Sequence, residues 1–125
     1  KKEKHNLKLV RLVVKNSKGQ LLAYKKSEGE WLSGQYEIPT CVMETSDPNF
    51  SQYPKWNGPK ISEEQQPVFK TTITKYTIQN IVYECNLADI KRCLSNDRYF
   101  VWLGKKDVKK LSTASTKALS KLRNY

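Results

Sequence analysis

The sequence predicts an α+β fold, in which a mixed β-sheet packs against helices that include a C-terminal amphipathic helix. Short runs of Val, Ile, Leu and Thr alternate with turn residues through most of the chain, which is typical of strands. Near the C-terminus the apolar residues adopt helical spacing instead. The 125 residues, 38% of them hydrophobic, are enough for one domain with its own core.

The first two strands are expected to form a hairpin. Residues 7–15 carry Leu and Val at positions of both parities, which predicts a central strand covered on both faces. Residues 16–19 have turn chemistry, with Gly19 able to adopt a positive φ. Residues 20–25 then return as the second strand.

Three more strands are predicted in the second half of the chain. Residues 67–76 and 77–86 are rich in Thr, Val and Ile, with a bulge expected near Gln79 and Asn80. Residues 98–103 predict the last strand.

The C-terminal helix is predicted from residue 113 onward. Its apolar residues follow the i, i+3, i+7, i+8 spacing of one helix face. They are Leu111, Ala114, Ala118, Leu119 and Leu122. The opposite face carries Lys117, Lys121 and Arg123.

Residues 44–66 predict a long proline-rich loop within this single domain of residues 1–125. Three prolines with nearby Asn and Gly exclude a long helix there. Phe50, Tyr53 and Trp56 are interspersed, so part of the loop is expected to pack against the domain. A loop of this length is either functional or partly disordered.

The charge balance is strongly basic. Twenty-three Lys and Arg against twelve Asp and Glu give a net charge of +11 and a pI near 9.6. Such an imbalance favours a polyanionic partner, nucleic acid or an acidic membrane face. A lysine-rich surface that serves only solubility is the alternative, and composition does not separate the two.

Several classes of protein are disfavoured. Cys41, Cys85 and Cys93 match no zinc or disulfide pattern, and His5 is the single histidine, so reduced and mostly buried thiols are expected. No apolar run approaches the roughly 20 residues of a membrane span, so no spanning segment is expected, and of the two polyanions nucleic acid, not a membrane, is the expected partner. The lysine-rich start has neither a signal-peptide core nor an initiator Met, which indicates a piece of a longer chain with residues 1–6 as a linker remnant.

One block resembles the segment that enters the signature helix of Nudix proteins. It reads Trp-Leu-Ser-Gly-Gln-Tyr-Glu-Ile-Pro, and its structural motif residues are Trp31, Gly34, Tyr36, Glu37 and Pro39. In that family the next helix carries a glutamate cluster that binds metal and hydrolyses a nucleoside diphosphate bond. Residues 40–49 contain no Arg-Glu-x-x-Glu-Glu run, and a lone Glu37 supplies neither a divalent metal site nor an acid–base pair. The resemblance therefore implies a scaffold that binds, with no catalytic and no metal-binding residues.

Further blocks make the resemblance more specific. Residues 21–26, 69–76 and 99–103 are similar to the first hairpin, the Phe-basic-His-x-Phe-Ser-His strand and turn, and the closing strand of one family. That family is the C-terminal, Nudix-like (MutT-like) domain of MutY-type A/G-specific adenine DNA glycosylases. The resemblance implies a non-catalytic DNA-binding domain in base excision repair. Its expected ligand is double-stranded DNA in which 8-oxoguanine lies opposite the adenine to be removed.

The same resemblance implies what lies outside this chain. The glycosylase activity and the iron–sulfur cluster typical of the family would belong to an upstream domain, so no cofactor is expected here. That domain, and repair or replication proteins, are the implied protein partners. The implied location is the cytoplasm, at the nucleoid, in a bacterium, or the nucleus or mitochondrion in a eukaryote.

The expected DNA-contacting residues follow from the turn of this family. Ile73, Thr74 and Lys75 stand at its Phe, Ser and His positions. Thr74 keeps a hydroxyl that can donate or accept, whereas Ile73 cannot stack as an aromatic ring does and Lys75 lacks the shape of an imidazole. Lys70 and Tyr76 complete the expected set.

Three other functions stay open. The chain could be a Nudix pyrophosphohydrolase, degenerate or active, that acts on oxidised nucleotides. It could instead be a repair-protein interaction module that docks through residues 44–66. A generic RNA-binding β domain is the third alternative, although no aromatic RNA-binding motif supports it.

Overall fold

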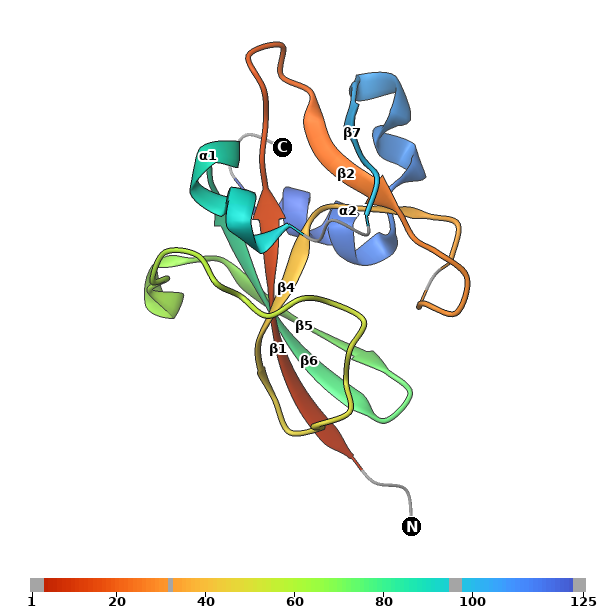
Figure 1. Ribbon diagram of the computed structural model, residues 1–125, viewed down its shortest axis with the longest axis vertical. Helices are drawn as coiled ribbons and strands as arrows, with labels where there is room; N and C mark the ends of the chain where they lie inside the picture. Colours follow the sequence, from red (N-terminus) through yellow and green to blue (C-terminus); the bar gives the residue numbers. More distant parts are fainter. Residues whose placement is uncertain (1–3, 32, 95–97, 123–125) are drawn as a thin grey trace.

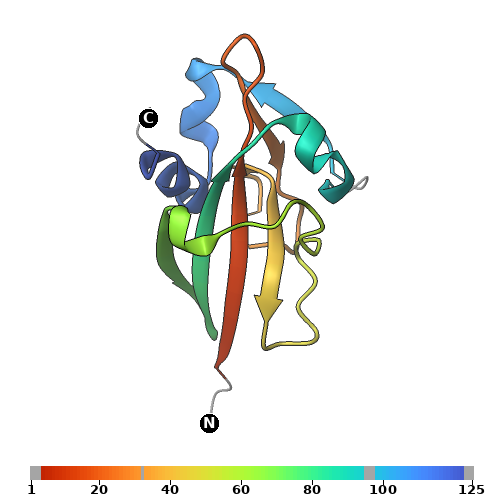
Figure 2. The same ribbon diagram turned by 90° about the vertical axis from the view of Figure 1, so that its left-hand side faces the viewer.

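Seven strands in two sheets form the framework of the described part of the chain. The computed structural model describes residues 4–31, 33–94 and 98–122. One sheet has the order β4-β1-β6-β5, formed by Thr40–Thr45, His5–Val13, Tyr76–Glu84 and Val68–Ile73 (Figures 1 and 2). The other has the order β3-β2-β7, formed by Tyr36–Glu37, Leu21–Lys25 and Phe100–Leu103.

Short helical segments flank the two sheets. The α-helices are α1 (Leu87–Ile90) and α2 (Thr113–Ser120). The 3₁₀ segments are η1 (Glu63–Gln65), η2 (Lys91–Cys93) and η3 (Lys105–Lys110). None of the helices within the described ranges is long and apolar enough to cross a membrane.

The prediction of a central first strand is confirmed. β1 lies between β4, which runs antiparallel to it, and β6, which runs parallel, so the sheet is mixed as expected. Leu9, Val10, Leu12 and Val13 are fully buried, since both faces of the strand are covered over this stretch. The earlier start of the strand corrects the predicted linker, because His5 and Asn6 already pair with β6.

The predicted first hairpin exists only at its turn. Asn16 N–H donates to Gln20 O at 3.1 Å, and Gly19 takes the expected positive φ of 76°. Beyond the bridge between Lys15 and Leu21 the two strands enter different sheets. The physical reason is that both edges of β1 are already paired, with β4 and β6, so β2 pairs with β3 and β7 instead.

The bulge expected near Gln79 and Asn80 is absent, because β6 keeps an unbroken register with both neighbouring strands. The irregularity lies instead between Lys8 and Leu9, opposite β4. Asn80 interrupts the apolar pattern for another reason: it is fully buried and bonds to Arg11 within the core. In the sequence, a buried and hydrogen-bonded Asn80 interrupts the apolar pattern of the strand in the same way as a bulge would.

The predicted C-terminal helix is confirmed as α2. Ser112 caps it, since its hydroxyl accepts from the Ser115 backbone N–H at 3.2 Å. Ala118 and Leu119 are buried against the sheets in one hydrophobic cluster. Arg123, expected on the exposed face, lies outside the described residues.

The proline-rich loop packs along the outer edge of β4, as its aromatic residues predicted. Residues 44 and 45 still belong to β4, which the sequence had not revealed, and η1 interrupts the loop near its end. Val42 N–H donates to Pro54 O at 2.7 Å, and Val42 O accepts from Trp56 N–H at 2.8 Å. Tyr53 is buried, so the loop is an integral layer of the domain.

Candidate functional site

A tight turn joins β5 to β6 at one end of the four-stranded sheet. Ile73 pairs with Tyr76, which leaves Thr74 and Lys75 as a two-residue loop; residues 73–76 are called the tip below. Thr74 and Lys75 are exposed. Thr74 has a φ of 48°, and it is the residue other than glycine with a positive φ in the described ranges. A β-branched residue in this conformation is strained by roughly 1–3 kcal/mol, and such strain concentrates at functional sites.

Hydrogen bonds fix the tip from beneath. The Tyr76 hydroxyl donates to an Asp47 carboxylate oxygen in a short hydrogen bond. That bond raises the pKa of Tyr76 to about 12 and lowers the pKa of Asp47. On the other side, His5 N–H donates to Lys75 O at 2.8 Å. The loop between β4 and η1 and the first strand therefore both hold the turn in place.

Aromatic rings support the tip as well. The Tyr76 ring lies 5.6 Å from the ring of His5, 5.3 Å from that of Trp31 and 5.5 Å from that of Phe50. Phe50 in turn contacts Tyr53, with ring centroids 6.1 Å apart. These rings come from four separate segments, and aromatic pairs at such distances stabilise by about 0.5–1.5 kcal/mol each. The tip is thus a rigid projection.

The predicted contact residues divide between supporting and exposed positions. Tyr76 and Ile73 are partly buried in the cluster beneath the tip. Thr74 and Lys75 are exposed, and the Lys75 ammonium lies 5.8 Å above the Tyr76 ring. Lys70 is exposed on the opposite face of β5 from Ile73, because the two lie three positions apart and side chains alternate between the faces of a strand.

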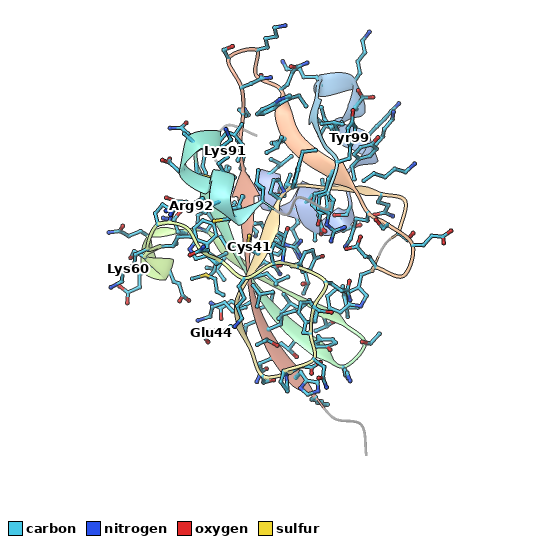
Figure 3. All side chains as sticks on the ribbon, in the orientation of Figure 1. Cys41, Glu44, Lys60, Lys91, Arg92 and Tyr99 are labelled. Atoms are coloured by element: carbon cyan, nitrogen blue, oxygen red, sulfur yellow. The ribbon has the colours of Figure 1, made fainter. Side chains whose placement is uncertain are left out.

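An open trough lies beside the tip, on the face of the sheet opposite the aromatic rings. Its volume is about 470 Å³. Lys8 at its floor contacts Glu63 at 3.0 Å and Glu44 at 3.7 Å, and Glu44 projects outward from the end of β4 (Figure 3). The remaining lining residues are Asn6, Leu7, Thr45, Ser46, Lys70, Thr77 and Gln79.

Glu37 occupies the centre of the protein, not its surface. Its carboxylate lies 2.6 Å from Arg11 Nη1 and 3.0 Å from Lys26 Nζ, and it accepts from the Tyr24 and Tyr53 hydroxyls. We call these five side chains the polar cluster. Burial alone would raise the pKa of Glu37, but the two cations outweigh burial and lower it. The sequence had indicated an isolated carboxylate; the structure surrounds it with donors.

Other members of the predicted structural motif anchor the same region. Gly34 has a φ of 88°, which a residue with a side chain rarely adopts. Pro39 O accepts from Leu12 N–H at 2.8 Å, and Tyr36 O accepts from Ser112 N–H at 2.7 Å. Trp31 belongs to the support of the tip. The motif thus connects the tip, the sheets and the start of α2.

Several acidic residues of the described ranges form ion pairs within the domain, and two of the described thiols have a raised pKa. Glu30 pairs with Arg98, and Asp107 pairs with Lys110. Burial raises the pKa of Cys41 and of Cys85 to about 12, so both are protonated thiols at neutral pH. No group of three or more His, Cys, Asp or Glu that could hold a metal ion occurs in the described ranges.

Lysines are distributed over both ends of the molecule. η3 carries Lys105, Lys106, Lys109 and Lys110 at the end far from the tip (Figure 1). The tip itself carries one exposed cation, Lys75, and Lys70 is exposed three positions before the tip on β5. The aromatic residues of the loop point inward, whereas Tyr99, beside β7, is 86% exposed (Figure 3).

Comparison with known proteins places the fold. No model of a known protein family matches the sequence, and neither does a curated protein. The MutT protein from Methanosarcina mazei is 17% identical, with a TM-score of 0.53 over 94% of this chain and 91% of that chain. A Nudix hydrolase from Nitrosomonas europaea is 10% identical, with a TM-score of 0.60 over 93% of this chain and 87% of that chain. The fold is Nudix-like.

A third structure matches less well. The C-terminal domain of mouse MUTYH, solved in complex with human PCNA, is 16% identical, with a TM-score of 0.48 over 94% of this chain and 86% of that chain. A likeness at this level carries no argument about function. The matches to the MutT protein and to the Nudix hydrolase confirm the α+β prediction at the level of a Nudix-like fold, and identities this low speak to fold alone.

Proposed function

We propose that this domain is a non-catalytic reader of damaged DNA, which recognises 8-oxoguanine opposite an adenine. The observation that carries the proposal is Thr74, an exposed hydroxyl held in a strained conformation at the tip. The resemblance to the MutY-type domain also implies a contact role for this residue. A strained and buttressed residue at a predicted contact position is what a preorganised reading site requires.

The tip offers the chemistry that such reading needs. The Thr74 hydroxyl can donate to or accept from the edge of a base, and Lys75 can reach a phosphate or a guanine acceptor. Lys70, on the trough side, would contact the backbone of the same strand. Ile73 and Tyr76 would hold the turn in position, since both are partly buried beneath it.

The role fits the energetics of adenine excision. A glycosylase must extrude its target base into a pocket, which costs a few kcal/mol of unstacking and unpairing. A domain that grips the opposite strand offsets part of that cost only when the opposite base is the oxidised one. The net charge of +11 supplies the sequence-independent attraction to the duplex.

The test is a binding measurement with matched duplexes. Fluorescence anisotropy would compare a duplex containing 8-oxoguanine·adenine with one containing guanine·adenine, for the native chain and for Thr74→Ala. The native chain should prefer the lesion, and Thr74→Ala should lose most of that preference. Thr116→Ala, which removes an exposed hydroxyl from α2, is the matched control and should behave as the native chain. Equal affinity of the native chain for both duplexes, or for single-stranded RNA, would contradict the proposal.

A Nudix pyrophosphohydrolase is the second candidate, because solved proteins named as hydrolases share the fold. The trough would then be the place for a nucleotide, with Lys8, Glu44 and Glu63 beside it. Incubation with 8-oxo-dGTP and Mg²⁺, followed by chromatography of the products, tests this candidate. Turnover that disappears in Glu44→Gln or Glu63→Gln would favour the hydrolase over the reader.

A further inference from the structure

The outer edge of β5 is open. β5 is the last strand of its sheet, and Figure 2 shows it at the left-hand rim with no further strand beyond it. The other edge of the same sheet is covered, because the loop bonds to Val42 of β4 through Pro54 O and Trp56 N–H. Proteins usually protect exposed edges, since unpaired backbone groups attract another strand.

The register identifies which backbone groups face outward. Val82 N–H donates across the ladder to Pro67 O at 2.9 Å. Because the direction of the N–H alternates along a strand, Asn80 and Ile78 also direct their N–H groups toward β5. Their partners in the register are Phe69 and Thr71.

The alternate residues of β5 therefore direct N–H and C=O away from the sheet. They are Val68, Lys70 and Thr72. No backbone hydrogen bond to another segment of the described ranges involves these groups. A run of three outward donor–acceptor pairs, without proline or bulge, matches the geometry by which peptides add as an extra strand.

The side chains along this edge set the chemistry of an added strand. Val68 is 39% exposed, an unusual position for a large apolar side chain in this molecule. Lys70 lies two residues further on the same face, beside the trough. On the opposite face the Lys117 ammonium lies 5.6 Å from the centre of the Phe69 ring. Apolar surface is thus flanked by a cation on each face of the strand.

We propose that the β5 edge is a docking site for an extended, acidic segment of a partner protein, which adds as a fifth strand. Apolar or β-branched residues of that segment would lie over Val68, and its carboxylates would face Lys70 and Lys117. Backbone hydrogen bonds would supply affinity, and the alternating side chains would supply specificity. The site shares Lys70 with the proposed DNA contacts but includes neither Thr74 nor Lys75, so a bound partner would leave the Thr74 hydroxyl accessible.

Two other occupants fit this edge less well. A second copy of the chain, paired antiparallel about the centre of β5, would set Lys70 directly against its own counterpart, and like charges opposite each other are destabilising. Each copy also carries a net charge of +11. The phosphates of a nucleic acid could pair with the lysines, but a nucleic acid has no peptide backbone to pair with the outward N–H and C=O groups of β5.

The experiment uses a blocked eight-residue peptide of alternating Val and Glu, and a counterpart of alternating Val and Lys. NMR amide exchange on the native chain would report each residue of β5. The acidic peptide should slow exchange at Val68, Lys70 and Thr72, while Phe69 and Thr71, already bonded to β6, should change little. The basic peptide should bind about tenfold more weakly.

Thr72→Pro is the decisive variant, because it removes one outward N–H and leaves the bonds to β6 intact. The affinity of Thr72→Pro for the acidic peptide should be lower than that of the native chain by about tenfold or more. Thr72→Val, which keeps the N–H, should bind the peptide as the native chain does. Equal binding by Thr72→Pro, or equal binding of both peptides, would overturn the proposal. Protection of the three amides by protein concentration alone, or by duplex DNA alone, would also overturn it in favour of a second copy or nucleic acid.

Discussion

Replacement of Thr74 should separate stability from recognition. At a φ of 48°, a residue with a Cβ is strained by roughly 1–2 kcal/mol. Thr74→Gly removes this strain but adds roughly 0.5–1 kcal/mol of chain entropy in the unfolded state. The free energy of unfolding should therefore rise by about 0.8 kcal/mol, within a range of roughly 0–1.5 kcal/mol. Thr74→Asn should stabilise at least as much, since Asn tolerates this conformation without the flexibility of Gly.

Recognition should change in the opposite direction. Thr74→Gly and Thr74→Ala both remove the hydroxyl, and one hydrogen bond contributes about 0.5–1.5 kcal/mol. The ratio of affinities for 8-oxoguanine·adenine and guanine·adenine should fall by about two- to thirteenfold. Thr74→Ala keeps the Cβ and the strain, so its stability should stay close to that of the native chain.

Urea unfolding would measure stability, and fluorescence anisotropy would measure recognition. Thr116→Gly is a useful control, because Gly in the exposed interior of α2 should destabilise by a few tenths of a kcal/mol, opposite in sign to Thr74→Gly. If Thr74→Gly lowered the free energy of unfolding, the claim that the native turn is strained would be refuted. If Thr74→Gly raised the free energy of unfolding but kept the full preference for the lesion, the strain would be supported and the proposed contact of the Thr74 hydroxyl with the base would be refuted.

Other perturbations test the support of the tip and the charges. Glu37→Gln should lower the free energy of unfolding by about 3–5 kcal/mol, because it leaves the cations of Arg11 and Lys26 buried, whereas Glu28→Gln in an exposed loop should have little effect in the same urea titration. Since the folded pKa of Glu37 lies below its ordinary value of 4.5, its stabilising contribution is complete above that pH and is lost as the pH falls through the folded pKa; Glu37→Gln should show a flatter acid dependence than the native chain. Tyr76→Phe, which removes the bond to Asp47, should speed amide exchange at His5, whose N–H donates to Lys75 O, more than at Ile81, and equal rates at His5 in both proteins would contradict the proposed support. If about four lysines contact phosphate, log affinity for duplex DNA should fall against log salt with a slope near −3.6, and a flat response would remove the electrostatic term.

The elements that sequence patterns predicted are those that local chemistry determines. The run of Leu and Val in β1, the turn at Gly19 and the apolar stripe of α2 each carry their own signal. β4 escaped prediction because its stability comes from pairing with β1, a contact between residues some thirty positions apart. The strands of the first predicted hairpin diverged for the same reason, since competition for the edges of β1 is not a local property.

The site shows the same division. The resemblance identified Thr74 as a candidate, but nothing in the sequence predicted its left-handed backbone. Tight hairpin turns are usually predicted from Gly or Asn, and this turn contains neither. The partners of Glu37 were equally hidden. Arg11 and Lys26 lie in separate strand and loop segments, and only the folded chain brings their cations to one carboxylate.

The buried carboxylate of Glu37 couples local unfolding of two loops to unfolding of the domain core. Lys26 leads into the loop that carries Trp31, and Tyr53 belongs to the loop that carries Asp47; both side chains are anchored on Glu37. The end of the domain that carries the tip is therefore coupled to its centre, and we expect opening of the tip to demand a large share of the global unfolding free energy. A binding assay alone would therefore not distinguish a loss of folding caused by a substitution at Glu37 from the loss of a contact made by the tip.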